Sequence, residues 1–453
     1  MRFLFLTARI LKWRRKQFAG NVFWGAVLLA LFPTQGLLGQ SSLKISGELR
    51  MRAEGRDNAD FNSERLDGKL FVLNRFRLGI EKNMRRNISV FAQVQDSRIW
   101  GEEGSSLGAL ENLDLHQAYL DIQRLFGAQI SARLGRQILD FGSGRFVGRT
   151  DWHNVGRAFG AANFQFGRRK QTLNIWLAHL RDQNAPTIMR NQEFGGAYFS
   201  KKTRRNDLFE AFALFFYDGR NYDALTDLDV PIDRSEETSS HLAVWTLGGR
   251  LKQQLFRRFT FEAEGARQLG NRGPIDVRAY TLAFETRLQL HKKRRFELMA
   301  GYTLGSGDDP ATIEKRETFL TLFPTGHQFL GVMDYAGMSN IASFHAGLRF
   351  CPAKNWIIGA KFYWLDLATD EDHWYRAAGY QIGSPAEIYR RAVAGAGRNL
   401  GGELDLFLEH RFRGQIDVKA GLSQLFVGEF IENTGGLRAD NSYWGYFSLT
   451  TRF

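Results

Sequence analysis

Arginines recur at short intervals between positions 134 and 159, where the chain reads LGRQILDFGSGRFVGRTDWHNVGRAF. Three of them could reach a carboxylate with paired donors, namely Arg145, Arg149 and Arg157. Gly142 and Gly144 would let a loop bend sharply here, and Asp151 is the nearest counter-charge. The segment therefore predicts either contact with an anionic substrate or an inward-folded loop in which arginine–aspartate pairs and Trp152 stabilise the fold.

Two other patterns were considered for catalysis, and neither is complete. The stretch GSGRFVG lacks the lysine and the following helix of a phosphate-binding loop. Ser343 and His345 lie two residues apart on one strand face, which suits a Ser–His hydrolase, but no carboxylate or amide is placed to orient the histidine. A pore-lining role for His345 is the simpler interpretation. We predict no catalytic residue and no enzymatic activity.

Metal and cofactor patterns are also weak. The acidic run that contains Asp366, Asp370, Glu371 and Asp372 could bind calcium in an external loop, but it lacks the spacing of an EF-hand. A solvated acidic loop is the preferred interpretation. The single cysteine, Cys351, excludes an internal disulfide, and no zinc-binding spacing is present. We therefore predict neither a metal ion nor a cofactor.

Short alternating segments fill most of the chain after its amino-terminal region and must position these residues. Helical periodicity is almost absent, and alternation over about ten residues is typical of membrane β-strands. The alternation predicts about eighteen strands, near 43–54, 70–81, 87–98, 114–123, 128–139, 157–167, 170–181, 193–202, 206–218, 239–253, 257–269, 275–291, 294–304, 340–351, 354–366, 399–413, 415–428 and 441–453. The predicted fold class is all-β, a single transmembrane antiparallel β-barrel.

The connections between these segments alternate in length. Short links, such as Lys82–Asn87 and Gly167–Lys170, follow the even-numbered strands. Long ones lie between them, notably Asp218–Ser239, Gly305–Asn340 and Ala368–Arg398. This pattern predicts short periplasmic turns and long extracellular loops, and it disfavours both a soluble sandwich and a tandem-domain protein.

Charged residues keep to one face of each predicted strand. In the first strand Glu48, Arg50 and Arg52 oppose Leu49 and Met51. A lysine or arginine facing lipid at mid-membrane would cost about 2–4 kcal/mol, so the charges must face inward. The resulting basic lumenal set is Arg50, Arg52, Arg75, Arg77, Arg133, Arg250, Lys252, Arg287, Arg349, Lys361 and Lys419. This set predicts an anion path, unless neighbouring carboxylates pair with these cations and simply fill the interior. Arg136 is in phase with Leu134 on the apolar face, which predicts a bulge or a rim position there.

Both ends of the chain indicate export to an outer membrane. Basic residues precede an apolar run from Val22 to Phe32, and small residues follow it, so residues 1–39 read as a cleavable signal peptide and 40–453 as the mature barrel. A retained membrane anchor is the alternative. The last strand ends at the aromatic Phe453, and this ending resembles the closing strand of bacterial outer-membrane barrels, which the assembly machinery recognises.

Composition supports a barrel with a polar interior. Aromatics make up 13% of the chain and charged residues 24%, a mixture unlike either a helical membrane bundle or a disordered chain. Six of the 61 basic residues lie in 1–39, which leaves 55 against 48 acidic residues and a net charge of +7 for the mature chain. These basic residues lie in strands and turns rather than in helical patches, so an anionic sugar or polymer is a better partner than nucleic acid.

A family resemblance rests on three segments: the block from Leu134 to Phe159, VQDSRIWG from Val94 to Gly101, and DLHQAYLDI from Asp114 to Ile122. Together they resemble the alginate export family of outer-membrane porins. The resemblance implies an eighteen-stranded monomeric barrel in the outer membrane of a Gram-negative-type bacterium, with an arginine-rich lumen that passes an anionic polysaccharide. The positions that match the family's block are Arg136, Gln137, Arg145, Asp151, Trp152, Asn154 and Arg157.

The sequence thus predicts a channel that passes an alginate-like polysaccharide or smaller acidic sugars by passive diffusion. The predicted lining residues are Arg50, Arg52, Arg75, Arg77, Arg133, Arg136, Arg145, Asp151, Asn154, Arg157, Arg250, Arg287, Arg349 and Lys361. The predicted partners are this cargo, outer-membrane lipid and the barrel-assembly machinery, with no nucleic acid. A non-conducting structural or adhesive barrel is the main alternative, and a barrel hydrolase is the lesser one.

Overall fold

The computed structural model describes residues 43–65, 67–102, 112–181, 192–203, 207–219, 241–256, 258–291, 295–309, 311–312, 314–377, 388–412, 415–435 and 439–453. The predicted signal peptide, 1–39, lies outside the described residues, as does most of the predicted long connection Asp218–Ser239.

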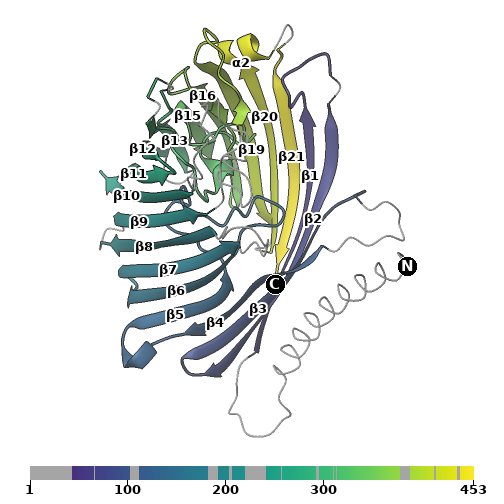
Figure 1. Ribbon diagram of the computed structural model, residues 1–453. Coiled ribbons are helices and arrows are strands. Elements are labelled where there is room, and N and C mark those ends of the chain that lie inside the picture. Colours follow the sequence, from purple (N-terminus) through teal and green to yellow (C-terminus); the bar gives the residue numbers. More distant parts are fainter. Residues whose placement is uncertain are drawn as a thin grey trace, which may run out of the picture. The chain divides into compact units, whose positions relative to one another are not determined.

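Eighteen antiparallel strands close into one barrel (Figure 1). They are β1 (Leu43–Asp57), β2 (Lys69–Arg85), β3 (Ile88–Ile99), β4 (Leu113–Ile122), β5 (Ile130–Gln137), β6 (Phe159–Arg168), β7 (Gln171–Arg181), β8 (Gln192–Lys202), β9 (Leu208–Asp218), β10 (Leu242–Leu255), β11 (Phe259–Arg272), β12 (Ile275–His291), β13 (Phe296–Gly305), β15 (Ile341–Phe350), β16 (Trp356–Asp366), β19 (Asn399–Phe412), β20 (Ile416–Val427) and β21 (Ser442–Arg452). The predicted fold class and strand order are confirmed.

The barrel closes where β1 pairs with β21, beside its pairing with β2. The backbone of Phe453 continues this seam, because Gly47 and Phe453 exchange two N–H···O bonds of 2.8 and 3.1 Å. The carboxyl-terminal strand is therefore the closing strand that its alternation predicted. Each of the eighteen described wall strands is paired on both sides, as a membrane barrel requires.

Exposure alternates along the strands as the charge pattern predicted. In β1, Arg50 and Arg52 are 7% and 3% exposed, whereas Leu49, next to Arg50, is 38% exposed and faces outward. The same contrast separates Arg77 from Phe76 in β2. The charged residues of these strands thus face the lumen. Within the described part of the chain, no helix is long and apolar enough to span a membrane.

Most connections follow the predicted alternation of short turns and long loops. One predicted outer connection is instead a turn of two residues, because β11 ends at Arg272 and β12 begins at Ile275. Shorter elements lie within the connections: η1 (Leu125–Gly127), β14 (Lys315–Arg316), η3 (Gly326–Gln328), β17 (Trp374–Tyr375), β18 (Ile388–Arg390) and α2 (Glu429–Thr434). β14 adds to β12 in parallel, and β17 pairs with β18.

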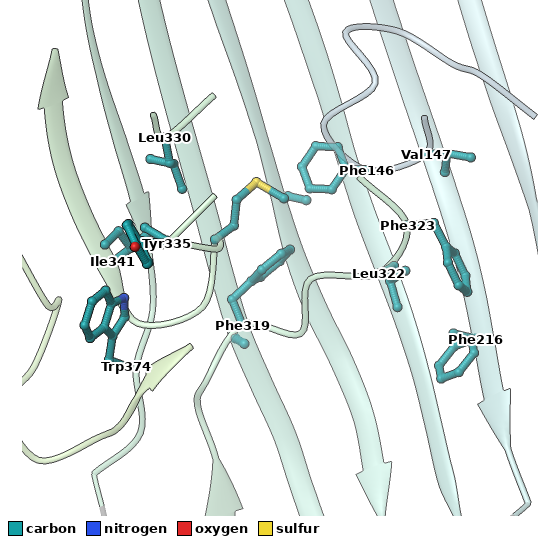
Figure 2. Close-up of a cluster of buried hydrophobic side chains, with 14 of the residues drawn as sticks. Phe146, Val147, Phe216, Phe319, Leu322, Phe323, Leu330, Tyr335, Ile341 and Trp374 are labelled. Atoms are coloured by element: carbon teal, nitrogen blue, oxygen red, sulfur yellow. The ribbon is translucent and has the colours of Figure 1, made fainter. Parts of the chain in front are cut away.

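The hydrophobic core lies inside the barrel (Figure 2). Two connections supply much of it: loop 138–158, between β5 and β6, and loop 306–340, between β13 and β15. Phe146 and Phe323 from these loops are 5% and 1% exposed, and they pack against Phe212 and Phe216, respectively, two inward residues of β9. The lumenal face of β7 to β10 is therefore partly apolar, where a polar lumen throughout was expected.

Candidate functional site

Loop 138–158 bends back into the lumen immediately after β5. Gly142 and Gly144 have φ values of +64° and +81°, in the left-handed region that only glycine adopts readily, which confirms the predicted bend. The backbone N–H of Phe141 donates to the carbonyl of Val147 at 3.0 Å and closes the turn. The loop then runs through the lumen toward β1 and β2, where it meets side chains near the middle of both strands.

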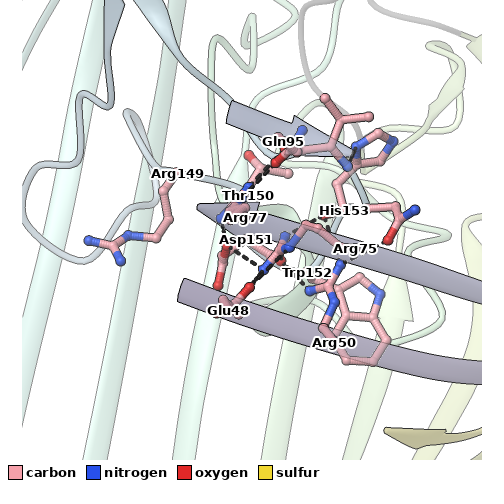
Figure 3. A network of polar contacts seen from close by, with 12 residues as sticks. Glu48, Arg50, Arg75, Arg77, Gln95, Arg149, Thr150, Asp151, Trp152 and His153 are labelled. Carbon is pink, nitrogen blue, oxygen red and sulfur yellow. Dashed lines mark hydrogen bonds and ion pairs between the residues drawn. The ribbon is translucent and has the colours of Figure 1, made fainter. Parts of the chain in front are cut away.

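Three wall arginines and Asp151 form what we name the arginine latch (Figure 3). Arg75 and Arg77 each donate to the Asp151 carboxylate at 3.0 Å, and Arg50 donates to the Asp151 carbonyl at 2.6 Å. Glu48 supplies a second carboxylate to Arg75 at 2.5 Å. Arg75 is 0% exposed. A buried cation without such partners would be costly, so this part of the loop and the wall stabilise one another.

Backbone carbonyls of the loop complete the latch. Arg75 donates to the carbonyl of His153 at 3.2 Å, and Arg77 donates to that of Val155 at 2.9 Å. The Asn154 side-chain amide donates to wall carbonyls in β2 and β3, both at 3.2 Å. Arg50, Arg75, Arg77, Asp151 and Asn154 thus lie together inside the barrel, and their donors and acceptors are largely occupied by each other. Asp151 pairs with wall arginines and not with the arginines of its own segment, for which the sequence predicted it as the counter-charge.

A stack of three side chains extends the latch toward the second loop. The Arg52 guanidinium lies 3.8 Å from the centre of the Trp152 ring, and His327 of loop 306–340 lies parallel to that ring at 3.9 Å. Glu54 neutralises Arg52 through a 2.7 Å bond, and Asp334 contacts His327 at 3.0 Å. Trp152 therefore has a partner on both faces and joins the two loops.

The two loops are also joined by a backbone ladder. Gly148 N–H donates to the Phe323 carbonyl at 2.8 Å, Phe323 N–H donates to the Phe146 carbonyl at 3.2 Å, and Thr325 N–H donates to the Gly144 carbonyl at 2.8 Å. These bonds run through the lumen, not along the wall. We name the joined segments, 144–150 and 319–325, the partition.

Loop 306–340 is held by carboxylates on the wall strand β19. Glu403 accepts from the Met333 N–H at 2.9 Å, and Asp405 accepts from the Val332 N–H at 3.3 Å. Gly331 makes this approach possible: its φ is +96°, and a Cβ there would lie 2.4 Å from the Glu403 carboxylate. Glu403 is 0% exposed. We name Glu403 and Asp405 the acidic anchor.

Strand β11 is a third part of the barrel wall that holds the partition. Arg145 donates to Glu264 at 3.3 Å and packs over the Phe329 ring, with its guanidinium carbon 4.1 Å from the ring centre. Gln268 exchanges two 2.8 Å bonds with the backbone of Leu320. Arg145, predicted as a substrate contact, therefore supports the inward fold of both loops.

A cavity of about 870 Å³ lies beside the partition. Its lining includes Trp152, Asn154 and Arg157 from loop 138–158 and Pro324 and His327 from loop 306–340. The Arg157 guanidinium donates to the carbonyls of Gly148 and Pro324 at 3.1 and 2.9 Å. Among the described residues it has no carboxylate partner within ion-pair distance. Arg157 thus brings a positive charge to the cavity that no described acid neutralises directly.

The ionisable groups of the loop are shifted by burial and by these neighbours. Burial alone would raise the pKa of Asp151, but Arg75, Arg77 and Arg50 outweigh it and lower the pKa to about 2. Burial, with Arg52 and Arg157 nearby, lowers the pKa of His153 below its usual range. Burial lowers the pKa of Arg157 to about 10. At neutral pH the latch therefore holds a carboxylate, and Arg157 remains charged.

The remaining predicted lining cations lie on the wall strands, and carboxylates on the same or neighbouring strands accompany them. The pairs are Arg133 with Asp121 at 2.6 Å, Arg250 with Glu210 at 2.7 Å, Arg287 with Glu285 at 2.5 Å, Arg349 with Glu297 at 3.6 Å, Lys252 with Glu262 at 3.3 Å and Lys419 with Glu409 at 3.4 Å. Lys361 has Glu285 as its nearest counter-charge. Interior pairing thus accounts for much of the inward charge.

Arg136 lies one residue before the end of β5 and pairs with Asp114 at 3.6 Å. Asp114 is the partner of Gln95 in the β3–β4 register, and Gln95 bonds Arg77 on the lumenal face. A register shift between Gln93 and Val94 accompanies this arrangement. An irregular register close to a strand end therefore explains why simple alternation placed Arg136 on the apolar face.

The catalytic and metal patterns stay separate from the latch and the cavity. Ser343 and His345 both point inward, being 1% and 5% exposed, and the Ser343 Oγ and His345 Nε2 lack a hydrogen-bond partner among the described atoms. Asp372 binds the N–H of Asp308 and the hydroxyl of Thr318, so it organises the loop. No cluster suited to a metal ion occurs in the described ranges.

Sequence reasoning missed the acidic anchor as a functional pair, although it placed both residues on the lumenal face. It also treated loop 306–340 as external. A signal was present, because the stretch TFLTLFPTGHQFLGVM, residues 318–333, is as apolar as a strand and lies in a connection that was expected to be solvated. Such a stretch indicates a buried loop.

Comparison with known families gives one match. A family model described as alginate export matches residues 41–444, nearly the whole chain. No curated protein shows a significant match to the sequence.

Solved structures with the same fold include three porins. OpdO of Pseudomonas aeruginosa has a TM-score of 0.58 at 13% identity, covering 91% of this chain and 97% of its own. OccK11 (OpdR) of the same organism has a TM-score of 0.55 at 12% identity, covering 93% and 99%. OccAB4 of Acinetobacter baumannii has a TM-score of 0.54 at 9% identity, covering 91% and 99%. At these identities the likeness concerns the fold.

Proposed function

Since the chain belongs to the alginate export family, whose members are outer-membrane β-barrels, we propose that it is an anion-preferring channel for acidic sugars or an alginate-like polysaccharide. Passage is by passive diffusion through the lumen. The barrel-assembly machinery inserts the chain, the outward faces contact outer-membrane lipid, and the barrel acts as a monomer.

The observation that carries this proposal is the charge of Arg157 at the cavity. Other arginines at the latch are already bound to Asp151, Glu48 or loop carbonyls, so they have little left to offer a cargo. Arg157 has carbonyl partners but no described acid beside it, and a carboxylate in the cavity would supply the missing counter-charge. Arg287 of β12 and Arg349 of β15 are partly exposed, and they extend the anion path through the lumen.

The test is ion selectivity in planar lipid bilayers. Under a potassium chloride gradient, the reversal potential of the wild-type protein should indicate anion preference, and Arg157→Gln should reduce the permeability ratio about two- to fivefold, as loss of about 0.5–1 kcal/mol of attraction predicts. Arg278→Gln is the matched control, because Arg278 is 51% exposed, pairs with Asp276 and lies outside the cavity lining. Unchanged selectivity in Arg157→Gln would remove the main support for the proposal.

A second candidate is a non-conducting structural or adhesive barrel, and the partition is the observation that favours it. Two joined loops that cross the lumen could close it entirely. The same bilayer measurement separates the two functions, since a closed barrel gives no channel events at any voltage.

A further inference from the structure

We infer that the cargo is a single acidic sugar or a very short oligomer and not a polymer chain, because the partition divides the lumen. This inference rests on the proposed channel function and narrows its substrate class. Three observations support it: how the partition is anchored, what lies at its centre, and the size and charge of the cavity beside it.

The partition is anchored to three separate parts of the barrel wall. The arginine latch holds loop 138–158 to β1 and β2 through Asp151. The acidic anchor holds loop 306–340 to β19 through the Met333 and Val332 N–H groups. On the third side, Gln268 of β11 bonds the Leu320 backbone. A segment fixed at three points and bonded to its neighbour does not swing aside without breaking several of these contacts at once.

The centre of the partition is apolar and closely packed (Figure 2). Phe319, Leu322 and Phe323 are 1%, 2% and 1% exposed. Phe323 makes edge contacts with Phe159 and Phe194, with ring centres 5.4 and 4.7 Å apart. A polyuronate threading this region would have to separate the aromatic side chains and bring its own hydrated carboxylates among them, which is unfavourable on both counts.

The cavity suits one small molecule. Its volume of about 870 Å³ lies within the range of about 300–1,000 Å³ typical of sites for single small ligands. Its charge is also limited. The lining holds four arginines, Arg52, Arg56, Arg157 and Arg376, against three acids, Glu54, Glu102 and Asp334, which leaves an excess of one positive charge. That excess matches one carboxylate, whereas a polymer would bring a carboxylate on every ring.

The experiment measures flux as a function of cargo length. Vesicles containing the full mature protein are loaded with a mixture of oligouronates of one, two, four and eight rings, and mass spectrometry follows what leaves them. The monomer and dimer should cross readily, and the eight-ring oligomer should cross at least tenfold more slowly. An eight-ring flux within twofold of the monomer flux would overturn the inference while leaving the channel function intact. If no length crosses and no conductance is seen, the proposed function itself fails.

A second arm asks whether the partition sets the limit. Phe146→Ser combined with Phe323→Ser should raise eight-ring flux at least fivefold, because it removes the Phe146–Phe319 contact between the two loops and the contacts of Phe323 with Phe159 and Phe194 on the wall. Phe256→Ser is the matched control, since Phe256 is 91% exposed and lies far along the chain from the partition. A folded double variant whose length limit is unchanged would contradict the partition as its cause. If the double variant does not fold, the wild-type length series still decides the inference.

Discussion

The two inward loops reach nearby parts of the barrel wall, β1 and β2 for one loop and β19 for the other, and are held there by complementary hydrogen-bonding groups. Loop 138–158 presents the Asp151 carboxylate and backbone carbonyls to arginines of β1 and β2. Loop 306–340 presents backbone N–H groups to carboxylates of β19. Each part of the wall supplies the donor or the acceptor that the loop beside it lacks. This is needed because a loop that leaves a strand has unpaired N–H and C=O groups. A barrel can therefore fill its lumen with backbone, provided that the facing wall supplies matching donors and acceptors.

An inward arginine can have either of two roles in this protein: it can hold a loop to the wall, or it can line a cavity. Arg75 and Arg77 are as buried as core residues and are bonded to the loop, whereas Arg157 faces a cavity. A positive charge on the lumenal face is therefore not enough to show that a residue lines the pore. Neutralising Arg75, Arg77 and Arg133 together would alter selectivity and release loop 138–158 at the same time, so Arg157 is the more informative single position.

The largest effect is expected from removing the carboxylate of the arginine latch. Asp151→Ala leaves Arg75 and Arg77, which are 1% and 9% exposed, without the acid that joins them. Removing one partner of a buried ion pair costs about 3–5 kcal/mol, and we expect about 3 kcal/mol because Asp151 itself is 40% exposed. The free energy of unfolding should fall by this amount, and single-channel conductance should rise as the loop leaves the wall.

Asp140→Ala in the same loop is the control for the latch. Asp140 pairs with Arg149 at 2.8 Å, but both side chains are substantially exposed, at 35% and 54%. Its removal should cost at most about 1 kcal/mol and leave conductance unchanged. Equal effects of the two substitutions would show that the loop is not held by the buried arginines.

A smaller effect is expected at the acidic anchor. Glu403→Ala leaves the buried Met333 N–H without an acceptor, which should cost about 1–3 kcal/mol. Glu403→Gln keeps an acceptor oxygen at the same place and should recover most of that loss. Glu409→Ala is the control on the same strand, because its pair with Lys419 is exposed on both sides. Thermal unfolding in detergent measures all three, and a glutamine variant as unstable as the alanine variant would indicate that charge, not the hydrogen bond, holds loop 306–340.

The wall was predictable from sequence because its pattern is local. Alternation with a period of two is readable within any ten residues, and it located β1, β12 and β21 to within a few residues. Facing followed from the cost of placing charge in lipid, which needs no knowledge of the neighbours. The closure of β21 on β1 followed in turn from an even number of strands.

The loops were not predictable in the same way because their partners are remote in sequence. Asp151 meets Arg75 across 76 positions, and Met333 meets Glu403 across 70. No period connects such pairs, and a loop carries no alternation that would fix its direction. The block around Asp151 was therefore recognised as important, but its role in holding the loop to the wall could be settled only by geometry.

The smallest expected effect concerns the pH dependence of stability at the arginine latch. The pKa of Asp151 is lowered from 3.8 to about 2, so its contribution to stability is fully present above pH 3.8 and is lost as pH falls through about 2. Because Asp151 is 40% exposed, we expect this contribution to be only about 1 kcal/mol after allowance for solvent screening. His153 acts in another window: its lowered pKa means that the unfolded chain binds the proton more readily, so stability falls as pH drops below 6.5. In a His153→Gln background, the difference in melting temperature between Asp151 and Asp151→Asn should stay constant from pH 7 to pH 4 and shrink only below that. A difference that vanished by pH 5 would mean that Asp151 does not ionise as a latched carboxylate should.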